Sequence, residues 1–194
     1  ISKAVPIALA VVFGFCAVAM IGIMVYFSCI DTKTDLGSFE RIIRFNDIWG
    51  THRGFMWIRS IWIFGDASFI EKLFGVGPDM FYSAFSPYFD DLSKYGDSST
   101  NAAHNEYLNY LITIGITGLL SYLAIVCGTI KNAVKYAKEN PMLIACVSAV
   151  ICYAVQSVVN LYQPITTPLF FIFIALCEAF VRNAKAEKSA VSAV

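Results

Sequence analysis

The sequence predicts an all-α, polytopic membrane protein with four transmembrane helices and a long folded extracytoplasmic loop between the first and the second. Three observations predict it: a composition poor in charge, three long stretches without any charged residue, and basic residues gathered in the short connections. Only 14% of the 194 residues are charged and 58% are hydrophobic, whereas soluble domains carry about 25% charged residues. The formal net charge is zero, so nothing indicates a nucleic-acid partner.

The charge-free stretches give the number of spans. Residues 4–30 and residues 107–130 are each long enough for one crossing of a ~30 Å hydrocarbon core. The third stretch, residues 140–177, would extend about 57 Å as one helix, which is too long for a single crossing. Polar and turn-forming residues interrupt it near Asn160 and Pro164. We therefore expect a helical hairpin with spans near 142–160 and 165–181.

The basic residues orient these spans. Cytoplasmic connections carry an excess of Lys and Arg, and the short segments of this chain are basic at Lys3, Lys131, Lys135, Lys138, Arg182, Lys185 and Lys188. The loop of residues 31–106 holds seven Lys or Arg against eleven Asp or Glu, so it faces outward. The predicted segments are a transmembrane helix at 1–30, the extracytoplasmic loop at 31–106, a transmembrane helix at 107–130, a cytoplasmic loop at 131–141, the hairpin at 142–181 and a cytoplasmic tail at 182–194.

The start of the chain predicts a fragment. It begins at Ile1 without an initiator Met, and its first apolar run is longer than the apolar core of a signal peptide. We therefore expect the C-terminal part of a larger helical membrane protein.

Polar and reactive residues near the spans have structural interpretations. The six cysteines lie within or at the ends of apolar runs and form no CxxC pair, so we expect them to pack as small hydrophobic residues. Glu178 lies four residues before Arg182, a spacing that favours an ion pair on one helix face at the cytoplasmic boundary.

The outer loop should fold. It is 76 residues long and rich in aromatic residues, whereas disordered segments have few of them. Its segment 55–64 holds two tryptophans, is too short to span and predicts an interfacial helix. Gly75, Gly77 and Pro78 predict a sharp break between two short helices. Residues 90–100 are polar and predict a solvated connection.

The loop ends at His104 and Asn105, where the second apolar run begins. Asn is a preferred N-cap, so a helix should start here, and helix N-termini attract anions such as phosphates. A continuous helix would place His104, Gly115 and Gly118 on one face, together with two leucines. The two glycines would then let another helix approach closely.

The segment Ala103–Leu108 (Ala-His-Asn-Glu-Tyr-Leu), followed by a span with Gly115 and Gly118, resembles the signature of the O-antigen ligase/O-antigen polymerase superfamily. Two further elements precede it in the order that the superfamily has: Arg53 followed by Trp57, and the Gly-x-Gly segment of residues 73–81.

Two segments after this span, residues 157–160 and 167–171, resemble the closing hairpin of the same superfamily. The resemblance covers roughly residues 40–180. One position departs from the pattern, because His52 stands where the superfamily often has Gly or Thr before the arginine.

The resemblance implies a metal-independent glycosyltransferase that needs no cofactor. Such an enzyme transfers or polymerises glycan from a donor linked to a polyprenyl diphosphate, for example undecaprenyl diphosphate. The acceptor is a glycan or a lipid. It works in surface polysaccharide assembly at the outer face of the bacterial cytoplasmic (inner) membrane.

The same resemblance implies catalytic roles for His104 and Arg53, which we expect to converge across the loop. A neutral histidine can accept the proton of the acceptor hydroxyl, and the guanidinium fork of arginine suits a diphosphate. His52, the other histidine of the chain, is the alternative base. The candidates for binding the diphosphate or the glycan are Arg59, Arg44, Arg41, Asn105 and Tyr107.

Two other function classes stay open at this point. A lipid-linked glycan transporter or flippase fragment would place charged residues within the spans, whereas the charges gather in the outer loop. A non-catalytic membrane subunit could use the aromatic loop to bind a partner. Within the superfamily, the absence of a long soluble C-terminal domain favours a polymerase over a ligase or a protein O-glycosyltransferase.

Overall fold

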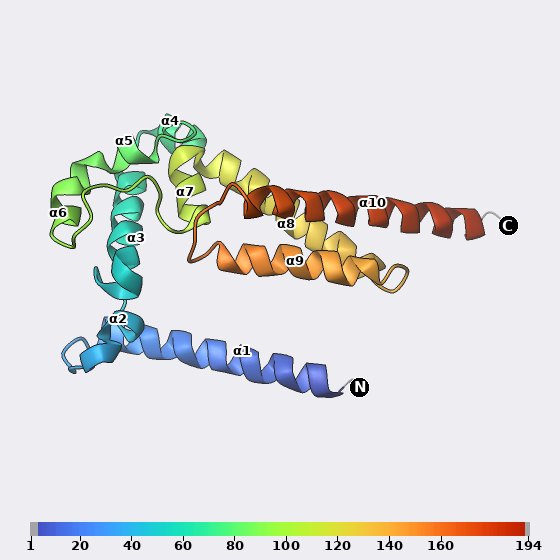
Figure 1. Cartoon of the computed structure of the whole chain (residues 1–194), viewed down its shortest axis with the longest axis horizontal. Helices are drawn as coiled ribbons and strands as arrows, with labels where there is room; N and C mark the ends of the chain where they lie inside the picture. The colour runs from blue at the N-terminus through green and yellow to red at the C-terminus, as the bar shows by residue number, and fades with distance from the viewer. Residues whose placement is uncertain (1–3, 193–194) are drawn as a thin grey trace. The chain divides into compact units, whose positions relative to one another are not determined.

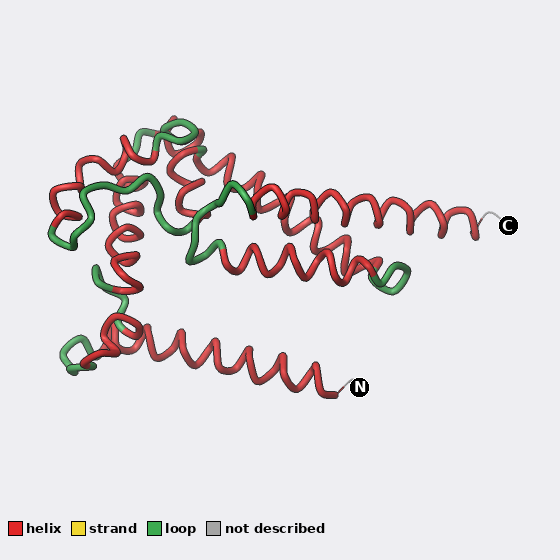
Figure 2. The backbone as a smooth tube through the Cα atoms, in the orientation of Figure 1, coloured by secondary structure: helices red, strands yellow, loops and turns green. Residues whose placement is uncertain are grey.

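The computed structural model describes residues 4–192, and every regular element in this range is helical (Figure 2). The all-α class is therefore confirmed. The chain divides into two compact units, and the division falls inside helix α3 after residue 58. Within residues 4–192, α8 (Gly115–Tyr136) is the one helix long and apolar enough to cross a membrane, while the apolar helical stretches Gly14–Ile30 and Met142–Gln156 are shorter. The four-span topology stays a prediction.

The N-terminal unit begins with α1 (Ala4–Val25), which passes into a π-helical turn, Tyr26–Ile30, where the first span is predicted. A 3-10 turn, Gly37–Phe39, and α2 (Glu40–Ile43) follow. The side chain of Arg44 closes the loop between the π-helical turn and α2. It donates hydrogen bonds to the backbone carbonyl oxygens of Phe27 (3.1 Å), Asp31 and Thr34. It also pairs with the carboxylate of Glu40 at 2.7 Å. These bonds satisfy carbonyl groups that a helix end leaves without partners.

Helix α3 (Trp49–Asp66) contains the predicted interfacial helix of residues 55–64. Its first turn is kinked by three consecutive residues with left-handed backbone, residues 50–52. Gly54 follows this kink, and a Cβ atom there would lie 1.9 Å from the carbonyl oxygen of Asn46. The rings of Phe45, Trp49 and Trp57 pack around the same turn with centroids 5.1–6.1 Å apart. Only glycine fits at position 54, so the turn before Arg53 has a fixed shape.

In the C-terminal unit, α8, α9 (Met142–Gln156) and α10 (Thr166–Ser192) pack against one another (Figure 1). The structure thus has a helix pair where the sequence predicts a hairpin, and its connection runs through residues 157–165 (Figure 2). One core cluster, nearer the connection, consists of Tyr122, Val126, Val150 and Phe170. The other consists of Ala133, Leu143, Cys146, Val147, Cys177 and Val181.

Helix α10 continues to Ser192, well past the end of the predicted span at residue 181. Its last part is rich in Ala, Lys and Glu, which favour a helix regardless of burial. The expected ion pair between Glu178 and Arg182 is present, at 2.8 Å. Cys146 and Cys177 are buried in the bundle as expected, whereas Cys16, Cys29, Cys127 and Cys152 are exposed on the isolated chain.

The helix predicted over residues 107–130 is not continuous. The structure has α7 (Glu106–Thr113) and α8 instead, separated at Ile114, and Gly115 has a left-handed backbone (φ +69°). The expectation that His104, Gly115 and Gly118 share one face of one helix was therefore wrong. The apolar run continues through the glycine turn without any charged residue that would mark a break. The break at Ile114 therefore could not be recognised from the polarity pattern.

The break is made by a crossing of two glycine-containing segments. A Cβ atom on Gly75 would lie 2.2 Å from the carbonyl carbon of Thr113, and one on Gly115 would lie 2.4 Å from that of Leu73. The backbone N–H of residue 76 donates to the Ile112 carbonyl, and that of residue 77 donates to the Thr113 carbonyl, both at 3.0 Å. These bonds satisfy carbonyl groups at the end of α7 that have no partner within the helix.

Short helices fold the rest of the outer loop. Helix α4 (Phe69–Phe74) begins with a capping box between Ser68 and Glu71 and ends at Gly75, as the glycine and proline signals predict. Helix α5 (Phe81–Phe85), a 3-10 turn (Ser86–Tyr88) and α6 (Phe89–Ser93) follow. The polar segment 90–100 is thus not wholly a solvated connection: α6 takes its first residues and buries Leu92.

Candidate functional site

Left-handed backbone at residues other than glycine is confined to three sequence motifs. Among residues 4–192 it occurs at Thr51 and His52, beside Arg53, at Asp79 in the Gly-x-Gly segment, and at His104. Each such residue costs on the order of 1–3 kcal/mol, and such residues concentrate at functional sites. These three segments, one in the N-terminal unit and two in the C-terminal unit, therefore contain the candidate functional residues.

His104 is held at the entrance of α7. Its φ is +50°, and the next residue, Asn105, returns to extended backbone and caps the helix. The Oδ1 atom of Asn105 accepts a hydrogen bond from the backbone N–H of Leu108 at 3.0 Å, which confirms the expected N-cap. Ala102 and Ala103 are buried directly before the histidine. His104 itself is half-buried, so its position is determined from both sides of the chain.

Glu106 joins this segment to the bundle, a role that sequence reasoning missed. Its carboxylate is buried and accepts hydrogen bonds from the hydroxyls of Tyr110 (2.8 Å), Ser157 (2.9 Å) and Tyr153 (3.1 Å). A signal was present in the sequence, because Tyr153 and Ser157 are four residues apart and therefore place two hydroxyls on one helix face. The contact connects residues 51 positions apart, beyond the reach of local patterns.

Tyr107, expected to touch substrate, has a structural partner. Its hydroxyl donates to the backbone carbonyl of Ala154 in the last turn of α9 at 2.7 Å, and its ring lies 6.1 Å from that of Tyr122. A helix leaves its last four carbonyls without intrahelical partners, and α7 supplies one. Asn105, Glu106 and Tyr107 together fix the residue that precedes them, His104.

The arginines differ in how far the fold already engages them. Arg44 is fully occupied in closing its loop, with hydrogen bonds to three carbonyls and the ion pair to Glu40. Arg59 lies over the ring of Trp62, 4.7 Å from its centroid. Arg41 is exposed and Arg53 is half-buried, and neither forms a hydrogen bond or ion pair within the described residues. Arg53 belongs to the N-terminal unit and His104 to the C-terminal unit, so their convergence stays a prediction.

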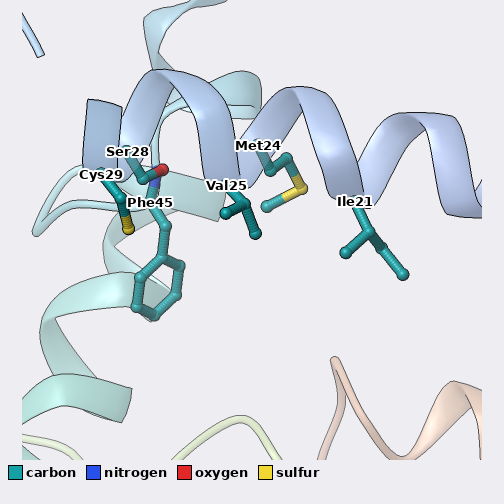
Figure 3. Close-up of a pocket in the computed structure, with 6 residues that line it drawn as sticks. All are labelled: Ile21, Met24, Val25, Ser28, Cys29 and Phe45. Atoms are coloured by element: carbon teal, nitrogen blue, oxygen red, sulfur yellow. The ribbon is translucent and has the colours of Figure 1, made fainter. Parts of the chain in front are cut away.

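Each unit contains a pocket. In the N-terminal unit an apolar pocket of about 270 Å³ runs along one side of α1, where Ile21, Val25 and Cys29 point to the side on which the Phe45 ring lies (Figure 3). Its surface suits an apolar chain. In the C-terminal unit a second cavity, here called the α7 pocket, has a volume of about 320 Å³. The α7 pocket is lined by Pro78, Asp79, Phe81, Asn101, Asn109, Tyr110, Thr113, Ile114 and Tyr162.

Comparison with known proteins identifies the family. The model of the O-antigen ligase family matches residues 3–123, more than half of the chain, and the match includes all three motifs with left-handed residues. No curated protein and no solved structure matches the chain. Proteins of this family are membrane proteins that act on lipid-linked glycans. The sequence match and the placement of the motifs agree: the chain belongs to the O-antigen ligase family.

Proposed function

We propose that this chain is the catalytic part of a membrane glycosyltransferase that transfers or polymerises glycan from a polyprenyl-diphosphate-linked donor. The observation that carries the proposal is the confinement of strained, non-glycine backbone to the segments of Arg53, Asp79 and His104. Strain of this kind persists only where surrounding structure maintains it. Beside Arg53, the close contact of Gly54 with Asn46 and the rings of Trp49 and Trp57 maintain it. Beside His104, the buried carboxylate of Glu106 maintains it.

Arg53 is assigned to the diphosphate. A leaving diphosphate needs fixed positive charge, and a guanidinium can bind two phosphate oxygens at once. The guanidinium of Arg44 is hydrogen-bonded within the fold, whereas that of Arg53 forms no hydrogen bond within the described residues and can bind a ligand. Arg41 and Arg59 are secondary contacts to the donor.

His104 is assigned to the acceptor. As a neutral imidazole it takes the proton of the acceptor hydroxyl while that oxygen attacks the anomeric carbon and the diphosphate leaves. Its rigid position matters because a general base must stay within hydrogen-bond reach of the proton it removes. With the predicted four-span topology, this reaction would take place at the outer face of the cytoplasmic membrane.

The test is glycan transfer by the full-length protein in membranes, with purified polyprenyl-diphosphate glycan as donor and chain length resolved on a gel. We expect His104→Ala to lower the rate at least about 100-fold, the usual scale of a lost general base. Arg53→Ala should lower it by about 100-fold or more, the usual scale of a lost donor to the charge that develops in the transition state. Arg41→Ala, at an exposed arginine, is the matched control and should lower it far less.

Each alternative has its own outcome. If His52→Ala abolishes transfer while His104→Ala leaves it intact, the assignment of the base is wrong. If both His104→Ala and Arg53→Ala retain full activity at matched abundance, the proposed site is wrong. A ladder of products indicates a polymerase, and a single shifted band indicates a ligase.

A further inference from the structure

The α7 pocket contains a buried polar group without a partner. The side chain of Asn109 lines the pocket and is only 6% exposed. Its Oδ1 atom has no hydrogen-bond partner among the described residues. Leaving such an oxygen unsatisfied costs free energy, and native proteins rarely do so without a reason. This oxygen is therefore a candidate acceptor for a hydrogen-bond donor from outside the chain.

The other polar groups of the pocket are also mainly acceptors. The Tyr110 hydroxyl gives its proton to Glu106 and the Thr113 hydroxyl gives its proton to the backbone of Asn109, both at 2.8 Å. The oxygens of both hydroxyls can therefore only accept further hydrogen bonds. Asp79 adds a carboxylate. A ligand that satisfies this lining must carry several donors of its own.

The lining also excludes an anion. None of the described residues around the pocket is Lys or Arg, and Asp79 contributes negative charge, so a diphosphate would be repelled. The ring of Tyr162 is 40% exposed at the edge of the pocket, and its hydroxyl lies 3.5 Å from the Asp79 carboxylate. An exposed aromatic face beside hydrogen-bond acceptors suits a ring with one apolar face and many hydroxyl groups.

We propose that the α7 pocket binds a neutral sugar ring of the glycan through its hydroxyl groups, apart from the groups that hold the diphosphate. This inference rests on the proposed function, since it names the part of the substrate that the pocket takes. The volume of about 320 Å³ lies at the lower end of small-molecule sites, which favours a short stretch of glycan. Asn101 and Asn109 flank His104 in the chain, so the pocket holds a sugar beside the segment of the proposed base.

The experiment measures sugar binding without turnover. The full-length protein in lipid nanodiscs is titrated with methyl glycosides of glucose, galactose, mannose and N-acetylglucosamine, and separately with farnesyl diphosphate. Wild type should bind at least one glycoside. Asn109→Leu, which keeps the shape but removes the acceptor, should weaken that binding at least tenfold and leave farnesyl diphosphate binding unchanged. Tyr162→Ala, which removes the exposed aromatic ring at the edge of the pocket, should have the same effect.

The control is Asp97→Asn, which removes an exposed carboxylate outside the pocket and should leave both affinities unchanged. The inference is overturned if wild type binds none of the glycosides, or if Asn109→Leu and Tyr162→Ala bind them as wild type does. It is equally overturned if both variants lose farnesyl diphosphate, because the pocket then holds the carrier. Sugar binding with the expected losses, in a protein that transfers no glycan, would refute the proposed function and leave the pocket assignment standing.

Discussion

Glu106 and Ser157 are joined twice, at the start of α7 and just beyond the end of α9. The Ser157 hydroxyl donates to the Glu106 carboxylate, and the backbone N–H of Glu106 donates to the Ser157 carbonyl, both at 2.9 Å. The first bond satisfies a buried charged side chain, and the second satisfies a carbonyl that the end of α9 leaves without a helical partner. The segment of His104 is thus attached to α9 as firmly as to the helix that follows it.

Replacing Glu106 should therefore destabilise the C-terminal unit. We expect Glu106→Ala to lower the free energy of unfolding by about 3 kcal/mol, because three hydroxyls lose a buried acceptor. Glu106→Gln should cost less, since the amide keeps one acceptor oxygen. Thermal unfolding in detergent measures both, with Glu187→Ala at an exposed position as control. Equal melting temperatures for Glu106→Ala and wild type would show that the carboxylate does not hold the helices together.

The glycine crossing should not tolerate a methyl group. Gly75→Ala and Gly115→Ala would each place a Cβ atom 2.2–2.4 Å from backbone atoms, at positions with left-handed φ. We expect each to cost at least about 2 kcal/mol and to lower membrane abundance. Gly128→Ala, in α8 with open space around it, should be neutral. Full abundance and stability of Gly115→Ala would refute the close approach of the two backbones.

Substitutions of Arg41 and Arg44 in the N-terminal unit should distinguish an arginine with a structural role from one without it. Arg44→Ala removes the hydrogen bonds that close the loop between Asp31 and Glu40, so limited proteolysis should cut this loop faster than in wild type. Arg44→Lys should rescue only in part, because an ammonium cannot reach the same carbonyls as a planar fork. Arg41→Ala should leave the cleavage pattern unchanged. Equal cleavage of Arg44→Ala and wild type would contradict the structural role.

The capping box of α4 should make a pH-dependent contribution to the stability of the fold. Hydrogen bonds from Ser68 hold the pKa of Glu71 below its ordinary value of 4.5. A lowered folded-state pKa means that the contribution is complete above the unfolded value and is lost as pH falls through the folded value. The melting temperature of wild type should therefore exceed that of Glu71→Gln at pH 7. The difference should shrink as the pH falls below 4.5 and vanish once the pH is below the folded-state pKa. A difference that persists at the lowest pH would contradict an ionised Glu71 in the box.

The topology can be tested by labelling. Lys94→Cys and Lys135→Cys, each in a background without native cysteines, should differ in intact cells: an impermeant thiol reagent should modify position 94 and spare position 135. The reverse pattern would overturn the four-span orientation.

Much of the helical layout could be predicted from the sequence, because charge-free runs and caps are local signals. Asn105 does cap a helix, and Gly75 does end one. The break at Ile114 could not be predicted, since it depends on a loop that crosses there from 40 positions earlier. The same holds for Glu106, whose partners on α9 are distant in sequence. Site residues were predicted by type, but only the fold separates Arg44, engaged in closing a loop, from Arg53.

The crossing of Gly75 and Gly115 has a consequence for how such enzymes diversify. It joins both ends of the intervening stretch to each other through backbone atoms, so this connection does not depend on which side chains residues 78–103 carry. Four lining residues of the α7 pocket, Pro78, Asp79, Phe81 and Asn101, come from this stretch. Pro78, Asp79 and Asn101 are exposed, so mutation at these positions can reshape the pocket while the crossing stays in place. With the proposed binding of a sugar, this would let one scaffold evolve toward many glycans.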